Sequence, residues 1–148
     1  MVKDKDIFLL DFYCGVGVIS IIMSEFYKKC IGVEINQNAI DVAEHNCKLN
    51  NCNNITFYCC EVENFITNLK SDNKFVIFVN PPRSGLKKEV INKINSIDKN
   101  LIIQIIYLSC CKKTLERDLS IFNFEYEIIK EYDMFPQTNH KEYLVRLF

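Results

Sequence analysis

The chain has few of the two residues that most often interrupt regular structure, with 4 glycines and 3 prolines among 148 residues. Its hydrophobic fraction of 49% is too high for a disordered or low-complexity chain. A chain of this length can bury a substantial core as one domain. In so sparing a sequence, most of these residues fall at predicted strand ends, where the chain turns.

The sequence also lacks a charge imbalance and a long apolar run. Lys and Arg number 18 against 19 Asp and Glu, for a net charge of -1, so nothing global indicates a nucleic-acid partner. Any RNA contact would have to come from a local patch or a partner domain. No run is long enough to cross a membrane, and the apolar start has no signal-peptide cleavage site. We expect an intracellular protein with reduced thiols.

Paired metal-binding spacings are missing as well. The eight cysteines contain no C-x-x-C pair, and the two histidines lie far apart, at positions 45 and 140. Structural zinc sites usually show short paired spacings, so we expect no metal site and mostly buried, inert cysteines. The residues alone leave the neighbouring Cys110 and Cys111 open: a redox pair, half a metal site, two buried fillers, or one nucleophile beside a bystander.

What the chain does contain is a regular alternation of apolar runs and helical patterns. The runs predict strands at 7–13, 29–35, 54–60, 74–80, 101–109, 124–134 and 141–148, and helices at 18–27, 37–50, 62–70, 87–97 and 113–122. Five β-α units followed by two strands predict an α/β fold with a seven-stranded, mostly parallel sheet, covered on both faces, whose last strand is antiparallel. No linker or repeat divides the chain, so we expect one domain over residues 1–148.

Ligands of such sheets bind beyond the carboxyl ends of the strands. Gly15 and Gly17 follow the first strand, but the loop lacks a third glycine for a dinucleotide and a G-K-[ST] for phosphate. Glu34 ends the second strand roughly 20 residues later, where an acid binds ribose hydroxyls. Glu61 ends the third strand, within reach of an adenine edge. The pattern favours a nucleoside cofactor without a pyrophosphate, namely S-adenosylmethionine.

Five stretches carry a family resemblance: "DFYCGVG", "GVEINQNAI", "VNPPRSGL", "YLSCCKKTLERDL" and "YDMFPQTNHKE". In this order they resemble the catalytic domain of RNA uracil-5-methyltransferases, which make 5-methyluridine in tRNA and rRNA. The resemblance covers essentially the whole chain. It implies a class I, Rossmann-like methyltransferase fold that binds S-adenosylmethionine, with RNA as partner. The implied cofactor residues are Asp11, Tyr13, Gly15, Gly17, Glu34, Glu61 and Asn80.

The same resemblance implies the catalytic roles. Residues 109–112 read S-C-C-K where the family has S-C-N-P, so Cys110 takes the nucleophile position and Cys111 stands where the family has asparagine. Glu142 ends the family's H-x-E motif and would be the general base. Asn80 and Arg83 lie in the P-P-R motif, which contacts RNA and the target base. A predicted helix N-terminus and two lysines follow Cys110, and positive surroundings favour a thiolate.

Three departures from the family pattern bear on activity. Asn80 replaces the usual aspartate, and its amide offers one acceptor oxygen and no charge. Cys111 and Lys112 replace Asn-Pro after the nucleophile. The RNA-binding region that usually precedes this domain in the family is absent from this chain. We therefore expect weakened or altered catalysis.

Other functions remain open from the sequence. An amino-methyltransferase would share the N-P-P stretch but has an aromatic residue where Arg83 stands, and it needs no thiol. A non-catalytic domain that binds cofactor or RNA, and a cytosine-5 enzyme, are further alternatives. An RNA-contacting patch is favoured only for the cations beside the site, Arg83 and Lys112. The wider set of candidate cations is Arg83, Lys87, Lys88, Lys112, Lys113 and Arg117.

Overall fold

A computed structural model of the chain describes residues 6–133, 137 and 141–148. Its strands are β1 (Phe8–Phe12), β2 (Lys29–Glu34), β3 (Ile55–Cys59), β4 (Phe75–Val79), β5 (Ile102–Ser109), β6 (Tyr126–Tyr132) and β7 (Glu142–Leu147). Its helices are α1 (Val18–Met23), α2 (Gln37–Leu49), α3 (Val62–Thr67), α4 (Lys88–Asn95) and α5 (Lys112–Leu119), and a 3-10 turn, Ser24–Phe26, follows α1. None of the helices in these ranges is long and apolar enough to span a membrane.

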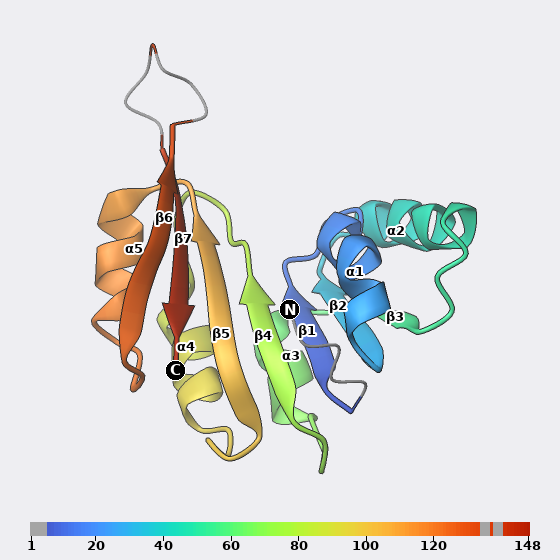
Figure 1. The fold of residues 1–148 in the computed structure, drawn as a ribbon, viewed down its shortest axis with the longest axis horizontal. Coiled ribbons are helices and arrows are strands. Elements are labelled where there is room, and N and C mark those ends of the chain that lie inside the picture. The colour runs from blue at the N-terminus through green and yellow to red at the C-terminus, as the bar shows by residue number, and fades with distance from the viewer. Residues whose placement is uncertain (1–5, 134–136, 138–140) are drawn as a thin grey trace.

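The strands form one sheet in the order β3-β2-β1-β4-β5-β7-β6 (Figure 1). Strands β1 to β5 pair in parallel, while β7 runs antiparallel to both β5 and β6. The predicted α/β fold, with its mostly parallel seven-stranded sheet and antiparallel last strand, is confirmed.

Local sequence explains where α2 begins and which face it buries. The side chain of Asn36 accepts hydrogen bonds from the backbone N–H groups of Asn38 and Ala39, which have no partner within the helix. Ile40, Ala43 and Cys47 then face the sheet and are buried. The helix predicted at 37–50 is thus confirmed, with a side-chain cap at its start and an apolar face toward the sheet.

The helices divide unevenly between the two faces of the sheet. Helices α3, α4 and α5 cover one face, where Phe12, Ile77 and Tyr107 are fully buried in the main core (Figure 1). Helices α1 and α2 lie on the other face, over β1, β2 and β3. Strands β1 and β2 therefore lie between two helical layers.

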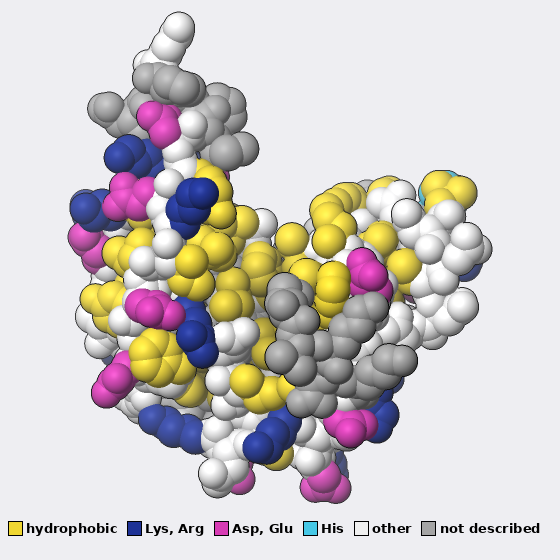
Figure 2. All heavy atoms as spheres, viewed as in Figure 1, with side chains coloured by type: hydrophobic (Ala, Val, Ile, Leu, Met, Phe, Trp, Pro, Cys, Tyr) yellow, Lys and Arg dark blue, Asp and Glu magenta, His cyan; other side chains and the backbone are white. Residues whose placement is uncertain are grey.

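On the face that carries α1 and α2, no described helix covers β4, β5 and β7. The side chains of Phe78, Ile106, Leu108 and Leu144 on these strands remain partly exposed, and Figure 2 shows hydrophobic side chains gathered across this half of the sheet. The expected cover of both faces is thus incomplete. The reason is topological: the crossovers after β3, β4 and β5 all pass over the opposite face, and β6 and β7 are joined without a helix.

Candidate active site at the carboxyl end of the sheet

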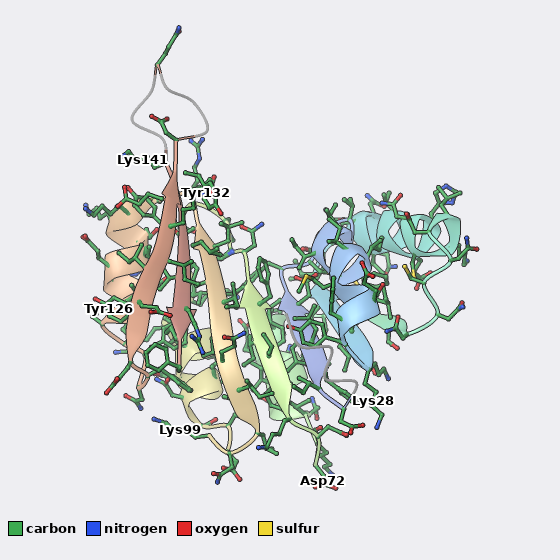
Figure 3. All side chains as sticks on the ribbon, viewed as in Figure 1. Lys28, Asp72, Lys99, Tyr126, Tyr132 and Lys141 are labelled. Carbon is green, nitrogen blue, oxygen red and sulfur yellow. The ribbon has the colours of Figure 1, made fainter. Side chains whose placement is uncertain are left out.

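The residues expected to act together gather where the parallel strands end. A hollow lies there between the lobe of α1 and α2 and the end of β5 and β7 (Figure 2). Tyr132 and Lys141 mark this end of the sheet, and Lys28, Asp72 and Lys99 mark the opposite end (Figure 3). Three loops, after β1, β4 and β5, border the hollow and carry most of the candidate residues.

The loop after β1 is a tight turn that requires its glycines. Gly15 and Gly17 have φ values of 53° and 81°, and Tyr13 has a φ of 64°. These values define a left-handed backbone conformation that residues other than glycine rarely adopt. A Cβ on Gly17 would lie 2.9 Å from the ring of Phe57. The sequence therefore folds the chain closely over β2 and β3 at this point.

The side chain of Asp11 stabilises this loop through hydrogen bonds to the start of α1. Its carboxylate is buried and accepts hydrogen bonds from the backbone N–H of Ser20 (3.0 Å) and from the Ser20 hydroxyl (2.7 Å). Burial raises the pKa of Asp11 to about 6, although the two bonds from Ser20 work in the opposite direction. The side chain ties β1 to the start of α1 and does not line the pocket described next.

Glu34 links the glycine loop to the end of β2. One carboxylate oxygen accepts a hydrogen bond from the N–H of Gly15 (3.2 Å), and the other accepts from the N–H groups of Ile35 (2.9 Å) and Asn36 (3.0 Å). These bonds hold the Glu34 carboxylate beside the glycine loop. This is the position from which the sequence predicts that it binds ribose hydroxyls.

A pocket of about 180 Å³ opens beside Glu34. Its walls combine three acids with an apolar surface, and its lining residues are Tyr13, Val33, Glu34, Ile35, Cys60, Glu61, Val62, Glu63 and Lys87. Burial, followed by the charge of Glu63, raises the pKa of Tyr13 to about 12, so the phenol is neutral. Tyr13, Glu34 and Glu61 are brought together as expected.

Lys87 closes one side of this pocket. Its ammonium lies 2.7 Å from a carboxylate oxygen of Glu63 and 3.3 Å from one of Glu61. Burial, the largest single influence, works to raise the pKa of Glu63, but the hydrogen bond and charge of Lys87 together with a backbone hydrogen bond lower that pKa overall. Lys87 was a candidate RNA contact from sequence; here it is engaged by two acids of the pocket.

The loop after β4 carries Asn80 and Arg83, both exposed. The N–H of Gly85 donates to the carbonyl of Pro82 (2.8 Å), which closes a turn with Arg83 near its tip. The hydroxyl of Thr114 in α5 lies 3.2 Å from the carbonyl oxygen of Arg83. The turn therefore rests on the helix that follows the cysteine pair.

Cys110, which follows β5, and Glu142, the first residue of β7, lie next to the last pair of the β5–β7 ladder. The last pair of this antiparallel ladder joins Ser109 to Tyr143, so Cys110 and Glu142 are the next residues outward at the carboxyl end of β5. Both side chains are partly exposed. The two expected catalytic residues, 32 positions apart, are thus adjacent on the same rim as Asn80 and Arg83.

Helix α5 begins at Lys112, one residue earlier than predicted, and its N-cap is Cys111. Cys110 therefore precedes the N-cap by one residue. The hydroxyl and backbone N–H of Thr114, with the N–H of Lys113, lower the pKa of the Cys111 thiol. None of these donors makes a full capping hydrogen bond with the sulfur, so the effect is that of oriented dipoles at a helix start.

The remaining cations of the expected patch have mixed surroundings. Lys112 lies 3.9 Å from Glu116 in the next turn of the helix, a weak, solvent-exposed ion pair. Arg117 is bound to backbone carbonyls and to Asp118. Lys88 and Lys113 are exposed.

Some features of the site were not found from the sequence. The apolar wall of Val33, Ile35 and Val62 and the closing contact of Lys87 depend on which loops meet, and no local signal identifies them. His140 of the H-x-E motif lies outside the described residues. In the ranges that the structure describes, no group of three or more His, Cys, Asp or Glu side chains could hold a metal, and the eight cysteines are free thiols.

A larger cavity of about 440 Å³ lies elsewhere, between α3 and the sheet, and extends to Phe8, Lys29 and Phe75 at the amino ends of their strands. None of the candidate site residues lines it. Size alone would favour this cavity, but the smaller pocket holds three acids and Tyr13, and its Glu34 is hydrogen-bonded to the glycine loop, so chemistry favours the smaller one.

Solved structures share this fold. The chain superimposes with a TM-score of 0.81 and 29% identity on the tRNA (uracil-54, C5)-methyltransferase of Pyrococcus abyssi in complex with S-adenosyl-L-homocysteine, over 99% of this chain and 35% of that one. An rRNA methylase of Streptococcus thermophilus, 14% identical with a TM-score of 0.72 over 97% and 87% of the two chains, shares the fold alone. The fold is that of the class I S-adenosylmethionine-dependent methyltransferases, as the sequence predicted.

The family follows from the whole sequence. Residues 1–148 match the family described as tRNA (Uracil-5-)-methyltransferase, and the chain belongs to that family. An uncharacterized RNA methyltransferase of Protochlamydia amoebophila is 41% identical over 144 residues, 94% of this chain and 32% of the relative. Another from Clostridium acetobutylicum is 37% identical over 149 residues, 99% of this chain and 31% of the relative. The chain spans about a third of the length of such relatives.

Proposed function

We propose that residues 1–148 form the catalytic domain of an S-adenosylmethionine-dependent RNA uracil-5-methyltransferase, with tRNA as the substrate class. The observation that carries the proposal is the placement of Cys110 and Glu142 side by side beyond the Ser109–Tyr143 pair. The turn with Arg83 rests on the helix that starts next to them. Family membership and the structural likeness to a tRNA methyltransferase support the choice of RNA. An RNA substrate also accords with the expected intracellular setting.

The pocket at Glu34 and Glu61 fits the nucleoside part of the cofactor. Carboxylates there can accept hydrogen bonds from ribose hydroxyls and from an adenine amino group, and Val33, Ile35 and Val62 give an apolar surface for the base. Gly15 and Gly17 let the backbone approach the ligand closely. When bound, S-adenosylmethionine supplies a methyl group activated by a sulfonium.

The chain's own residues would make C5 of uracil reactive. The Cys110 thiolate adds to C6, so a C–S bond forms and electron density moves to C5, which is otherwise a poor nucleophile. Once C5 carries the methyl group, the Glu142 carboxylate removes the C5 proton. The C6–S bond then breaks, which restores the double bond and the thiolate. Covalent addition in this way replaces one difficult step by easier ones.

Asn80 and Arg83 would hold the target base. The Asn80 amide can donate and accept hydrogen bonds at the uracil edge, without the charge of an aspartate. Arg83 lies exposed at the tip of its turn, where a guanidinium can contact a phosphate or the base. The uracil must leave its stack to reach this rim.

The deciding experiment mixes the protein with S-adenosylmethionine and a tRNA transcript that contains 5-fluorouridine. Fluorine at C5 cannot leave as a proton, so a working enzyme stays bound to its substrate, and peptide mass spectrometry identifies the modified residue. We expect an adduct on Cys110. Cys110→Ser should form no adduct, and Cys111→Ser, a matched change of the neighbouring thiol, should still form one.

Other outcomes would replace the proposal. An adduct on Cys111 would exchange the roles of the two thiols, in line with its lowered pKa. Methylation of RNA that survives Cys110→Ala would indicate amino-group transfer, which needs no thiol. Cofactor binding without an adduct or methylation would indicate a non-catalytic binding domain.

A further inference from the structure

Helix α5 contacts the backbone of the turn that carries Arg83 at four points. The Thr114 hydroxyl lies 3.2 Å from the carbonyl of Arg83. One guanidinium nitrogen of Arg117 donates to the carbonyls of Ser84 (2.9 Å) and Leu86 (3.1 Å). The N–H of Leu86 donates to a carboxylate oxygen of Asp118 (2.7 Å). These bonds hold nearly every residue from 83 to 86 against one helix.

Asp118 is the centre of this arrangement, and its burial is costly. The side chain is fully buried, yet both oxygens are hydrogen-bonded: one also accepts from the hydroxyl of Tyr107 (2.7 Å), and the other accepts from two nitrogens of Arg117 (2.8 and 2.6 Å). A buried carboxylate is tolerated only with such partners. All of these contacts except that with Tyr107 are made with the turn or with Arg117, which itself binds the turn.

Gly85 shows how tight the contact is. Its φ is +75°, and a Cβ placed on it would lie 2.6 Å from the Asp118 carboxylate and 2.7 Å from the Arg117 guanidinium. Any larger residue would therefore push the turn away from α5. Glycine permits both the backbone conformation and the close approach.

The same helix adjoins the cysteine pair. Helix α5 starts at Lys112, directly after Cys111, its N-cap, and Cys110. Its first turn therefore sits beside Cys110, and its last turn, through Arg117 and Asp118, holds the turn with Arg83. The separation between the thiol and the base-contacting turn is set by one short, rigid element.

We propose that Arg117 and Asp118 are positioning residues that hold the Arg83 turn in register with the Cys110 thiol. The proposal rests on the proposed function for its catalytic meaning, and on the hydrogen bonds above for its structural part. Both residues would act through the turn and not by contact with the substrate. Because a misplacement of about 1 Å can slow a reaction roughly a hundredfold, a loosened turn should slow attack on uracil far more than it weakens the cofactor pocket, which the same loop reaches only through Lys87.

Two variants loosen the contact from opposite sides. Arg117→Lys keeps a positive charge beside Asp118 but lacks the planar fork that spans two carbonyls, and Arg117 is half-exposed, so folding should survive. Gly85→Ala places a methyl group between the turn and α5 and should push the turn away from the helix. The matched control is Arg146→Lys, which makes the same change at an arginine paired with Glu127 on β7 and β6.

The readouts separate positioning from general damage. With 5-fluorouridine tRNA at saturation, Arg117→Lys and Gly85→Ala should trap RNA between about ten- and a hundredfold more slowly than the parent and Arg146→Lys. The dissociation constants for RNA and S-adenosylhomocysteine should change less than about threefold, a split that mere loss of stability would not give. Amide hydrogen exchange should rise at Gly85 and Leu86 and stay unchanged in β1 and β4.

Two results would overturn the proposal directly: trapping rates equal to the parent, or parallel losses of trapping, cofactor binding and thermal stability. If the parent protein itself traps no RNA, the proposed function has failed, and hydrogen exchange decides alone. Selective exchange at Gly85 and Leu86 would then uphold the positioning of the turn, and unchanged exchange there would refute it.

Discussion

At the scale of single residues, side chains of one type behave differently because their surroundings differ. Cys60 and Cys111 are both partly exposed thiols. Burial, then the neighbouring Cys59, raises the pKa of Cys60, whereas the donors at the start of α5 lower the pKa of Cys111. From the sequence alone, both thiols would be assigned the same ordinary pKa. The difference has measurable consequences for reactivity.

We predict that iodoacetamide at pH 7.5 modifies Cys111 several-fold faster than Cys60, because only the thiolate is alkylated. Thr114→Val keeps the shape of the side chain but removes the hydroxyl, the largest cause of the lowered pKa, and should slow Cys111 selectively. Peptide mass spectrometry over a time course measures both rates. Equal slowing of both thiols by Thr114→Val would contradict this cause.

Asp11 gives a second residue-scale prediction. Its folded pKa of about 6 lies above its ordinary value of about 3.9. Its contribution to stability is therefore complete below about pH 4 and is lost as the pH rises through about 6. Asp11→Asn keeps an acceptor for Ser20 and cannot ionise, so it should gain stability relative to the parent at pH 7.5 by at most about 3 kcal/mol.

Urea unfolding between pH 4.5 and pH 7.5 measures this difference for Asp11→Asn. Asp72→Asn, at an exposed position near the opposite end of the sheet, serves as the control and should follow the parent (Figure 3). Curves for Asp11→Asn and the parent that run parallel across this range would show that burial of Asp11 does not set the pH dependence.

At the scale of elements, the site is made by loops that form hydrogen bonds and ion pairs with helices distant from them in the sequence. The loop after β4 is bound to α5 through Arg117 and Asp118, and its end is bound to the start of α3 through Lys87. Lys87 is the N-cap of α4 and pairs with Glu61, the N-cap of α3. The cofactor pocket thus shares one loop with the substrate side.

Lys87→Met should weaken the binding of S-adenosylhomocysteine by roughly two- to fivefold, the size expected for largely exposed ion pairs. The reason is that Glu63 would remain buried without its cation and the pocket would lose one wall. Lys88→Met, at the exposed neighbouring position, is the matched control. Titration calorimetry compares the three proteins, and equal affinities would show that Lys87 does not support the pocket.

At the scale of the whole molecule, the sheet collects distant residues at one edge. Because β1, β2, β4 and β5 are parallel, the loops after them open on the same side, and antiparallel β7 starts there. A ligand that binds across these loops should therefore stabilise the domain as a unit. Its effect is visible in global unfolding.

S-adenosylhomocysteine at a hundred times its dissociation constant should add about 2.7 kcal/mol to the free energy of unfolding. For a domain of this size, that is a rise in melting temperature of roughly 5–11 °C. Gly17→Ala should lose most of the shift, because its φ of 81° and its contact with Phe57 leave no room for a methyl group. ATP should give no shift, since the loop lacks phosphate-binding machinery.

Differential scanning fluorimetry is sufficient for this comparison. An equal shift for Gly17→Ala and the parent would place the ligand away from the glycine loop. A shift with ATP as large as that with S-adenosylhomocysteine would point to a different class of nucleotide.

The sequence by itself determined the fold class, the order of elements and most of the candidate site. Apolar runs and helical periodicity reflect local burial, so they can be read without the fold, and the α/β sheet with its antiparallel last strand is confirmed. Glu34 was predicted because an acid at the end of the second strand follows from strand position, whereas Cys110 and Glu142 were predicted from the family resemblance. Motif order identified the family.

Only the tertiary structure decided which side chains meet. The start of α5 at Lys112 gives the N-cap to Cys111, a shift of one residue that periodicity cannot resolve. Lys87 looked like a surface cation until the loop after β4 brought it to Glu61 and Glu63. Arg117 and Asp118 looked like ordinary helix charges until the turn at Gly85 closed on them. Such contacts join residues 24 or more positions apart, and their energies depend on burial and distance, which the chain acquires only when it folds.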